Sequence, residues 1–78
     1  MKKKILQYNI ILRPELEGGF TVVIPALPGC ITYGKNLKEA KEMAYDAISA
    51  YLVSIKKHGG RVLSDKDNLF TTLEVAYV

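Results

Sequence analysis

The chain has 78 residues, a length that suits one small domain and excludes a large enzyme built around a cofactor pocket. Apolar residues make up 49% of the chain and charged residues 24%, which is typical of a folded globular protein and excludes a disordered one. The formal net charge of +3 leaves nucleic acid open as a partner, but three of the eleven basic residues are Lys2, Lys3 and Lys4, in an expected basic tail at residues 1–4.

Cysteine content limits the chemistry further. Cys30 is the single cysteine, so an intramolecular disulfide and a zinc site built on paired cysteines are excluded. We therefore expect a reducing compartment, the cytoplasm, and no cofactor. The apolar run after the basic tail is far shorter than the roughly 20 residues that cross a bilayer, so we expect no signal peptide and no membrane partner.

The first part of the chain predicts three strands. Residues 5–13 alternate apolar and polar side chains, which is the period of a half-buried strand. Pro14 and the turn formers that follow it reverse the chain, so that residues 20–25 return as the second strand of a hairpin. Two prolines and a glycine within residues 25–29 interrupt the pairing before a short third strand at residues 30–34.

A helix is predicted over residues 36–58. Asn36 is a favourable N-cap, and Glu39 follows at the spacing that lets its carboxylate reach back to the amide of the cap. The helix should end near His58, where two glycines follow. Apolar residues at intervals of three and four form one stripe along it: Leu37, Ala40, Ala44, Ala47, Ile48, Tyr51, Leu52 and Ile55.

The remainder of the chain predicts a surface loop and a fourth strand. Residues 61–68 are rich in charge and turn formers, whereas residues 69–78 resume the alternation of a strand. The complete order is βββαβ. We expect one α+β domain over residues 1–78 with two layers, in which one amphipathic helix packs on a small, mainly antiparallel sheet.

The sheet face turned away from the helix is predicted to carry Ile11, Val23 and Ile31. An apolar face of this kind should be covered by a second subunit or another partner, and we expect a homodimer, with a tetramer as an open alternative. Tyr45 is a further interface candidate, because it falls on the polar side of the helix, where an exposed aromatic side chain more often marks a contact surface.

Catalytic chemistry finds little support in the sequence. A two-metal nuclease site needs several converging carboxylates, the first of which normally projects from strand one, and residues 5–13 contain none. Glu42 and Asp46 share a helical face but interleave with lysines, which favours a solvated ion-pair surface over a metal site. We expect that the protein is not an enzyme and that it holds no metal.

The segment from Pro25 to Ala40, PALPGCITYGKNLKEA, resembles the signature stretch of the HicB-like antitoxin family, in a version without the DNA-binding tail. Neighbouring residues extend the resemblance over roughly residues 8–60, and it implies a degenerate, partial ribonuclease-H-like fold of order βββαβ. We read the signature itself as structural, with Cys30 as an inert core thiol. Its motif residues are Pro25, Pro28, Gly29, Cys30, Gly34, Glu39 and Ala40.

The resemblance implies a non-catalytic interaction module that binds and neutralises a small ribonuclease toxin of the HicA type. Family members commonly carry a C-terminal segment that binds operator DNA, and we expect this chain to lack it. The alternative is a stand-alone, self-assembling domain with weak nucleic-acid binding through its lysines; a neighbouring reading frame for a small basic protein with a glycine-flanked histidine would favour the toxin partner. The lysines concerned are those of the tail and Lys38, Lys41, Lys56 and Lys57.

Overall fold

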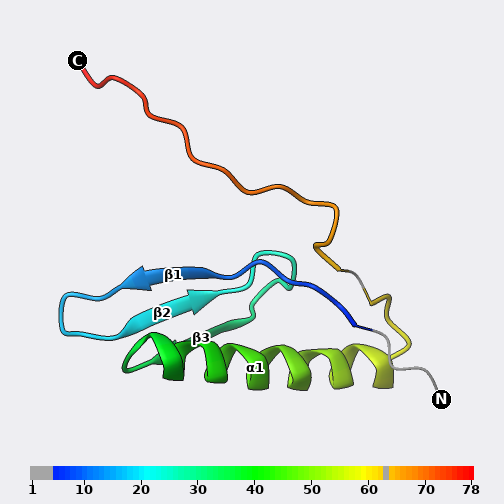
Figure 1. The fold of residues 1–78 in the computed structure, drawn as a ribbon. Coiled ribbons are helices and arrows are strands. Elements are labelled where there is room, and N and C mark those ends of the chain that lie inside the picture. Colours follow the sequence, from blue (N-terminus) through cyan, green and yellow to red (C-terminus); the bar gives the residue numbers. More distant parts are fainter. Residues whose placement is uncertain (1–4, 63) are drawn as a thin grey trace.

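The computed structural model describes residues 5–62 and 64–78, so the predicted basic tail at residues 1–4 lies outside the described residues. Three antiparallel strands form a sheet in the order β1-β2-β3, and one helix lies against one face of it (Figure 1). The elements are β1 (Ile11–Pro14), β2 (Phe20–Val23), β3 (Ile31–Gly34) and α1 (Leu37–Lys57). This arrangement confirms the predicted α+β class, with its two layers of one helix and one sheet.

A tight turn joins β1 to β2 as predicted. The amide of Glu15 donates to the carbonyl of Gly19 over 3.0 Å, and the amide of Gly18 donates to the carbonyl of Glu15 over 3.0 Å. Gly18 and Gly19 have φ angles of 103° and 78°, a region that L side chains rarely adopt. The reversal therefore depends on these two glycines.

The prediction of a first strand over residues 5–13 is wrong for its first half. Strand β2 bends away after Val23, because the amide of Ile24 donates to the carbonyl of Cys30 over 3.1 Å, and residues before Ile11 have no β2 partner. Residues 7–9 instead bond to residues 64–65. The same bend makes the other two strands shorter than predicted, since β2 ends at Val23 and β3 begins at Ile31.

The helix begins and ends where its caps predict. The side-chain oxygen of Asn36 accepts a hydrogen bond of 2.8 Å from the amide of Glu39. The carboxylate of Glu39 accepts from the amide of Lys35 over 3.1 Å, one residue before the amide that the sequence suggested. His58 is the C-cap, and its amide donates to carbonyls of the last turn. The predicted range 36–58 thus comprises the helix and both caps.

The core lies between the sheet and the first half of α1. Gly34 is essential to this contact, because a Cβ atom there would collide with the backbone of Ala40. Leu37, predicted to belong to the apolar stripe, is half exposed because it precedes the turn that meets the sheet. The buried apolar residues are Val22, Ile24, Leu27, Cys30, Ala40 and Ala44, and the partly buried ones packed on them are Tyr8, Ile10, Leu12, Phe20, Ala47, Ile48, Tyr51 and Ile55.

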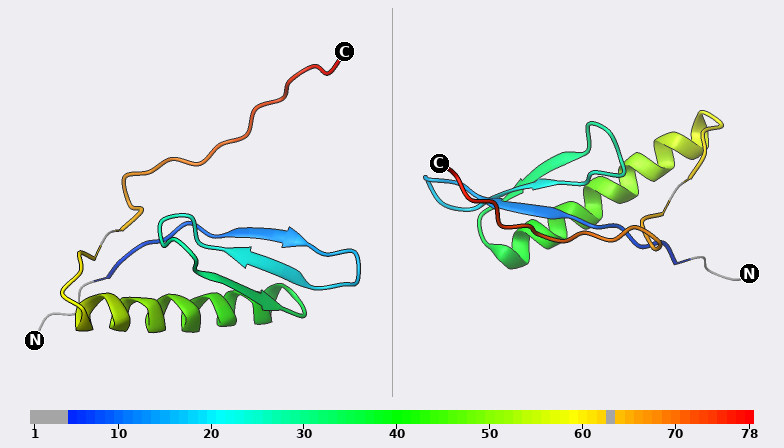
Figure 2. Two further views of the ribbon diagram at one scale, coloured as in Figure 1. Left: turned by 180° about the vertical axis from the view of Figure 1, so that it is seen from behind. Right: turned by 90° about the horizontal axis from the view of Figure 1, so that it is seen from above.

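The predicted fourth strand over residues 69–78 is wrong. This stretch, called the C-terminal segment below, is extended and exposed and joins no strand among the described residues. It leaves the rest of the described chain, residues 5–62 and 64–68, called the body below, on the side of the sheet opposite α1, as Figures 1 and 2 show. The molecule is elongated, with principal extents of 53, 27 and 22 Å. Alternation provides an apolar side, but a strand also needs a neighbouring edge for its backbone groups, and no backbone hydrogen bond joins this segment to β1 or β3 in the part of the chain that the structure describes.

Candidate protein-interaction surfaces

The sheet face opposite α1 carries the apolar row predicted from the sequence. Ile11 is paired with Val23, and Val23 with Ile31, so that the three side chains form one row across all three strands. Ile11 is 45% exposed and Ile31 61% exposed, whereas Val22, which points to the helix, is fully buried. The row is therefore on the surface, as expected, and its role as an interface stays a prediction.

The row has an aromatic and polar border. In the next row on the same face, Arg13 is paired with Thr21, and Thr21 with Tyr33. The hydroxyl of Tyr33 donates to the carbonyl of Gly18 over 3.0 Å, which holds the half-exposed ring beside the β1–β2 turn. An apolar centre with a polar rim is the usual composition of a protein contact surface. We call this face, with the apolar row and Tyr33, the outer sheet face.

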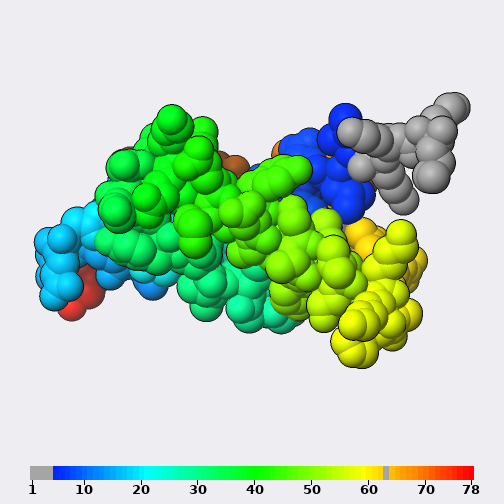
Figure 3. All heavy atoms as spheres, turned by 90° about the horizontal axis from the view of Figure 1, so that it is seen from below, coloured from blue at the N-terminus to red at the C-terminus, as the bar shows by residue number. Residues whose placement is uncertain are grey.

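Tyr45, the fourth interface candidate, lies elsewhere. Its side chain is 73% exposed on α1, so the structure does not bring it together with the apolar row. It borders a groove of about 290 Å³ between the N-terminal segment and the helix, called the helix-side groove below. Figure 3 shows the two walls of this groove side by side, the N-terminal segment in blue and the helix in green. The lining residues are Leu6, Tyr8, Tyr45, Ile48, Ser49 and Leu52.

The signature loop between β2 and β3 has a structural explanation. The amide of Leu27 donates to the carbonyl of Ile24 over 3.1 Å, and the amide of Cys30 donates to that of Leu27 over 3.0 Å. Gly29 has a φ angle of 81°, which lets the chain turn into β3. The hydroxyl of Tyr51 donates to the carbonyl of Pro28 over 2.9 Å and fastens the loop to α1.

Cys30 lies in the core beneath this loop. Its side chain is buried, and burial raises the pKa of the thiol above its ordinary value because the thiolate is poorly solvated there. A raised pKa lowers the fraction of reactive thiolate at neutral pH. The environment of Cys30 thus favours the inert core thiol expected from the sequence.

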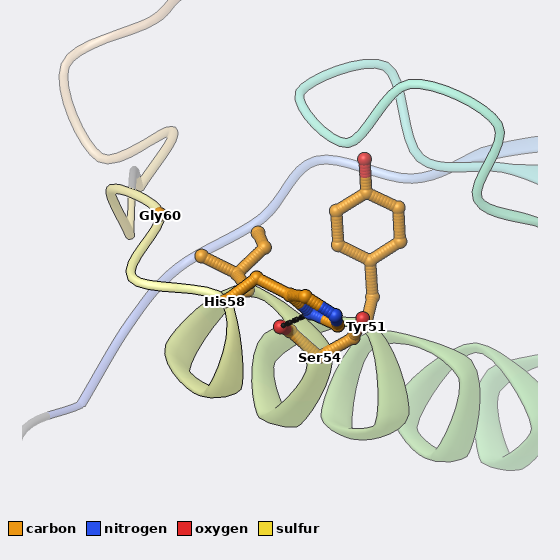
Figure 4. Close-up of a pocket in the computed structure, with 5 residues that line it drawn as sticks. Tyr51, Ser54, His58 and Gly60 are labelled. Atoms are coloured by element: carbon orange, nitrogen blue, oxygen red, sulfur yellow. Dashed lines mark hydrogen bonds between the residues drawn. The ribbon is translucent and has the colours of Figure 1, made fainter.

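A hollow of about 400 Å³ lies at the C-terminal end of α1, lined by Tyr51, Ser54, Ile55, His58 and Gly60 (Figure 4). The Nδ1 atom of His58 donates to the carbonyl of Ser54 over 2.8 Å, within the same helix. The imidazole therefore satisfies a free carbonyl at the helix end, which is a capping role.

Sequence reasoning missed the buried carboxylate of Asp65. It is only 2% exposed, although residues 61–68 were predicted to be a surface loop. Its Oδ2 atom accepts from the amide of Asn9 over 3.0 Å, its Oδ1 atom accepts from the side-chain amide of Asn68 over 2.6 Å, and its own amide donates to the carbonyl of Gln7 over 2.7 Å. We call this cluster the Asp65 anchor. Its sequence signal is the turn chemistry of Asp and Asn three residues apart, which predicts a turn and not its burial.

The Asp65 anchor also affects a neighbouring tyrosine. Desolvation, and to a smaller degree the negative charge of Asp65, raise the pKa of the Tyr8 hydroxyl above its ordinary value near 10. In the described ranges, no three His, Cys, Asp or Glu side chains come close enough to hold a metal ion. Within the same ranges, no helix combines the length and the apolar character needed to cross a bilayer.

Comparisons with known proteins identify relatives over most of the chain. Residues 8–73 match the family described as the HicB-like antitoxin of bacterial toxin–antitoxin systems. A UPF0150 protein of Thermoplasma acidophilum is 42% identical over 60 residues, which cover 77% of this chain and 87% of that protein. A UPF0150 protein of Synechocystis is 36% identical over 53 residues, or 68% of this chain and 67% of that protein. Antitoxin HicB 1 of Photorhabdus laumondii is 42% identical over 45 residues, which cover 58% of this chain and 29% of that longer protein.

Proposed function

Because the chain belongs to the HicB-like antitoxin family of bacterial toxin–antitoxin systems, we propose that it is a non-catalytic interaction module that binds and neutralises a small HicA-type ribonuclease toxin. We propose the cytoplasm as its compartment, which the unpaired thiol of Cys30 supports. Neutralisation of this kind requires a surface complementary to the toxin and no catalytic group of the antitoxin.

The outer sheet face is the observation that carries the proposal. Its apolar row lies across three hydrogen-bonded strands, so the side chains are held in fixed positions before any partner arrives. Ile31 and Tyr33 are exposed on β3, at the border of this row. A rigid apolar patch loses little conformational entropy on binding, and its centre is where most of the binding free energy of an interface is found. A toxin that turned its RNA-binding side toward this face would have that side blocked by the antitoxin.

The test is inhibition of RNA cleavage by a purified HicA-type toxin in the presence of the full chain. Ile31→Lys places a charge in the apolar row at an exposed edge position, and we expect the inhibition constant to rise at least about tenfold, which corresponds to about 1.4 kcal/mol. Val53→Lys is the matched control, because Val53 is an equally exposed apolar residue on α1. The proposal fails if the wild-type chain does not inhibit, or if both variants inhibit as well as the wild type.

Nucleic-acid binding through the helix lysines is the second candidate function. Lys38, Lys41 and Tyr45 are exposed and, by their spacing, share one flank of α1. Phosphate contacts of lysines weaken steeply with salt, so an RNA oligonucleotide should be titrated at low and at physiological ionic strength. If Lys38→Gln with Lys41→Gln abolishes RNA binding and leaves toxin inhibition unchanged, the two functions are separate. If toxin inhibition falls to the same degree, the outer sheet face is not the determining surface.

A further inference from the structure

The C-terminal segment is the largest feature that the proposed function leaves unexplained. Ten consecutive residues are extended and exposed, with Glu74 as the one charged side chain among them. An extended chain with this composition has the features of a strand that lacks its partner. Six large apolar side chains, between 53% and 115% exposed, lie along it: Leu69, Phe70, Leu73, Val75, Tyr77 and Val78.

The same molecule offers a matching acceptor. Strand β1 has one neighbouring strand, β2, in the described part of the chain, so its other side is a sheet edge. The helix-side groove lies next to this region and is lined by Leu6, Tyr8 and the flank of α1. Helix α1 packs mainly on β3 and β2, so it covers little of the sheet at β1. A strand added beside β1 would satisfy the edge and place alternate side chains over the groove.

We propose that the C-terminal segment of one copy pairs as a strand with the β1 edge of a second copy, with its apolar side chains covering the helix-side groove there. Each chain carries both the donor segment and the acceptor edge, so two copies related by a two-fold axis satisfy each other and the assembly closes as a dimer. The homodimer expected from the sequence then forms through the C-terminal segment and the β1 edge, and not through the apolar row of Ile11, Val23 and Ile31. The inference is independent of the toxin.

The direction of the segment favours a second copy over its own sheet. The Asp65 anchor fixes the last turn before the segment, where the amide of Asn68 donates to the carbonyl of Asp65 over 2.9 Å. From this turn the segment leaves on the side of the sheet opposite α1, whereas the groove lies on the helix side (Figures 1 and 2). The segment therefore points away from the groove of its own copy and is free to reach that of another.

The dimensions of donor and acceptor agree. Ten extended residues span about 33 Å, which equals the span of residues 5–14. The last four of these residues are β1, and the first six form the N-terminal segment that borders the groove. Alternation places four of the large apolar side chains of the C-terminal segment on the groove side: Leu69, Leu73, Val75 and Tyr77. If each buries roughly 100 Å² and covers a similar area of the partner, two exchanged segments remove about 1,600 Å² from water, which is the size of a standard stable interface. Exchange of both segments thus provides enough area for a stable dimer.

The experiment measures the mass of the full chain by light scattering after size-exclusion chromatography at micromolar concentration. The wild type should have twice the chain mass of 8.7 kDa. A donor variant, Leu73→Lys with Val75→Lys, and an acceptor variant, Tyr45→Lys with Leu52→Lys, should each raise the dimer dissociation constant at least about 100-fold and elute as monomers. Val53→Lys is the control, because Val53 is an exposed apolar residue of α1 that does not line the groove, and this variant should remain dimeric. Far-ultraviolet circular dichroism verifies that every variant keeps its helix.

Mixing the two variants distinguishes exchange from any other dimer. The donor variant retains an intact groove and the acceptor variant an intact segment, so an equimolar mixture can form one of the two exchanges and should contain more dimer than either variant alone. The proposal is overturned if the wild type is monomeric, if the donor variant remains dimeric, or if the mixture, titrated to high concentration, contains no more dimer than either variant alone. A segment that serves a toxin or another partner would give the first of these results.

Discussion

Strand β2 and the C-terminal segment are both rich in apolar side chains but have very different surroundings. Val22 of β2 is fully buried between two neighbouring strands and the helix, whereas Val75 of the segment is 84% exposed. Both stretches are extended. They differ in their backbone partners, because β2 is hydrogen-bonded on both sides and the segment on neither side within the described chain.

An alternating sequence is often taken to imply both an apolar side and the burial of that side, and these two regions show that the second does not follow from the first. Alternation creates an apolar side and a polar side, and it does so in any extended chain. Burial requires in addition a free edge and a layer to cover, which depend on the rest of the fold or on a second molecule. The body and the segment are therefore expected to respond differently to the same kind of substitution.

The largest effect should come from truncating the core behind β2. Ile24 is 1% exposed, and Ile24→Ala removes buried methyl groups and leaves a cavity, which should lower the free energy of unfolding by about 2–5 kcal/mol at every protein concentration. Val75→Ala should have an effect that fades as the chain is diluted, because Val75 is buried only in the dimer. Urea titrations followed by circular dichroism at two protein concentrations measure both. A concentration-independent loss for Val75→Ala would remove the distinction between the two regions.

Close backbone packing of helix on sheet is a second property of the body that the exposed segment lacks. In Gly34→Ala the new methyl group meets the backbone of Ala40, which cannot move without displacing α1, and we expect a loss of about 3 kcal/mol. Gly29→Ala is the matched control, since its φ of 81° makes alanine unfavourable but no atom lies within 4 Å of the new methyl group, and it should lose about 1 kcal/mol. Thermal unfolding of the two variants compares crowding with backbone conformation. Equal losses would show that helix and sheet are less closely packed at Gly34.

The Asp65 anchor joins the two regions, and its loss should have an intermediate effect. Asp65→Asn replaces a carboxylate oxygen by an amide that cannot accept from both Asn9 and Asn68, which should lower the free energy of unfolding by about 1–3 kcal/mol. Asp67→Asn, at an exposed position nearby, should change it by less than about 0.5 kcal/mol. The two variants are compared by chemical denaturation at one protein concentration. If they agree, the anchor does not fix the start of the segment.

Alkaline pH should give the smallest effect, at the same junction. The raised pKa of Tyr8 means that the unfolded chain loses this proton at a lower pH than the folded chain does. Its contribution to stability is thus complete below about pH 10, the ordinary tyrosine value, and is lost as the pH rises through the folded pKa. The raised pKa of Cys30 also lowers stability as the pH rises, so the effect of Tyr8 is isolated by comparing the wild type with Tyr8→Phe. The Tyr8→Phe variant should lose less stability between about pH 9 and 11. Identical pH profiles would mean that Tyr8 is not desolvated.

Local signals in the sequence predicted the body well. Asn36 and His58 are the helix caps that the sequence indicated, since a cap depends on residues within one turn. The surface row of Ile11, Val23 and Ile31 also follows from local rules, because a hairpin with a known turn sets its own register. Asp65 could not be placed in this way. Its hydrogen bond to Asn9 joins residues 56 positions apart, and no period or turn motif connects them.

That separation in sequence also orders the steps of folding. The two hairpins and the helix are closed by contacts between near neighbours along the chain, which form on the microsecond scale. The bonds from Ser64 and Asp65 to Gln7 and Asn9 close a loop that contains almost the whole body, so we expect them to form after the sheet and the helix. We therefore expect the Asp65 anchor to close last in folding, so that the C-terminal segment takes its direction only after the sheet that it leaves is complete.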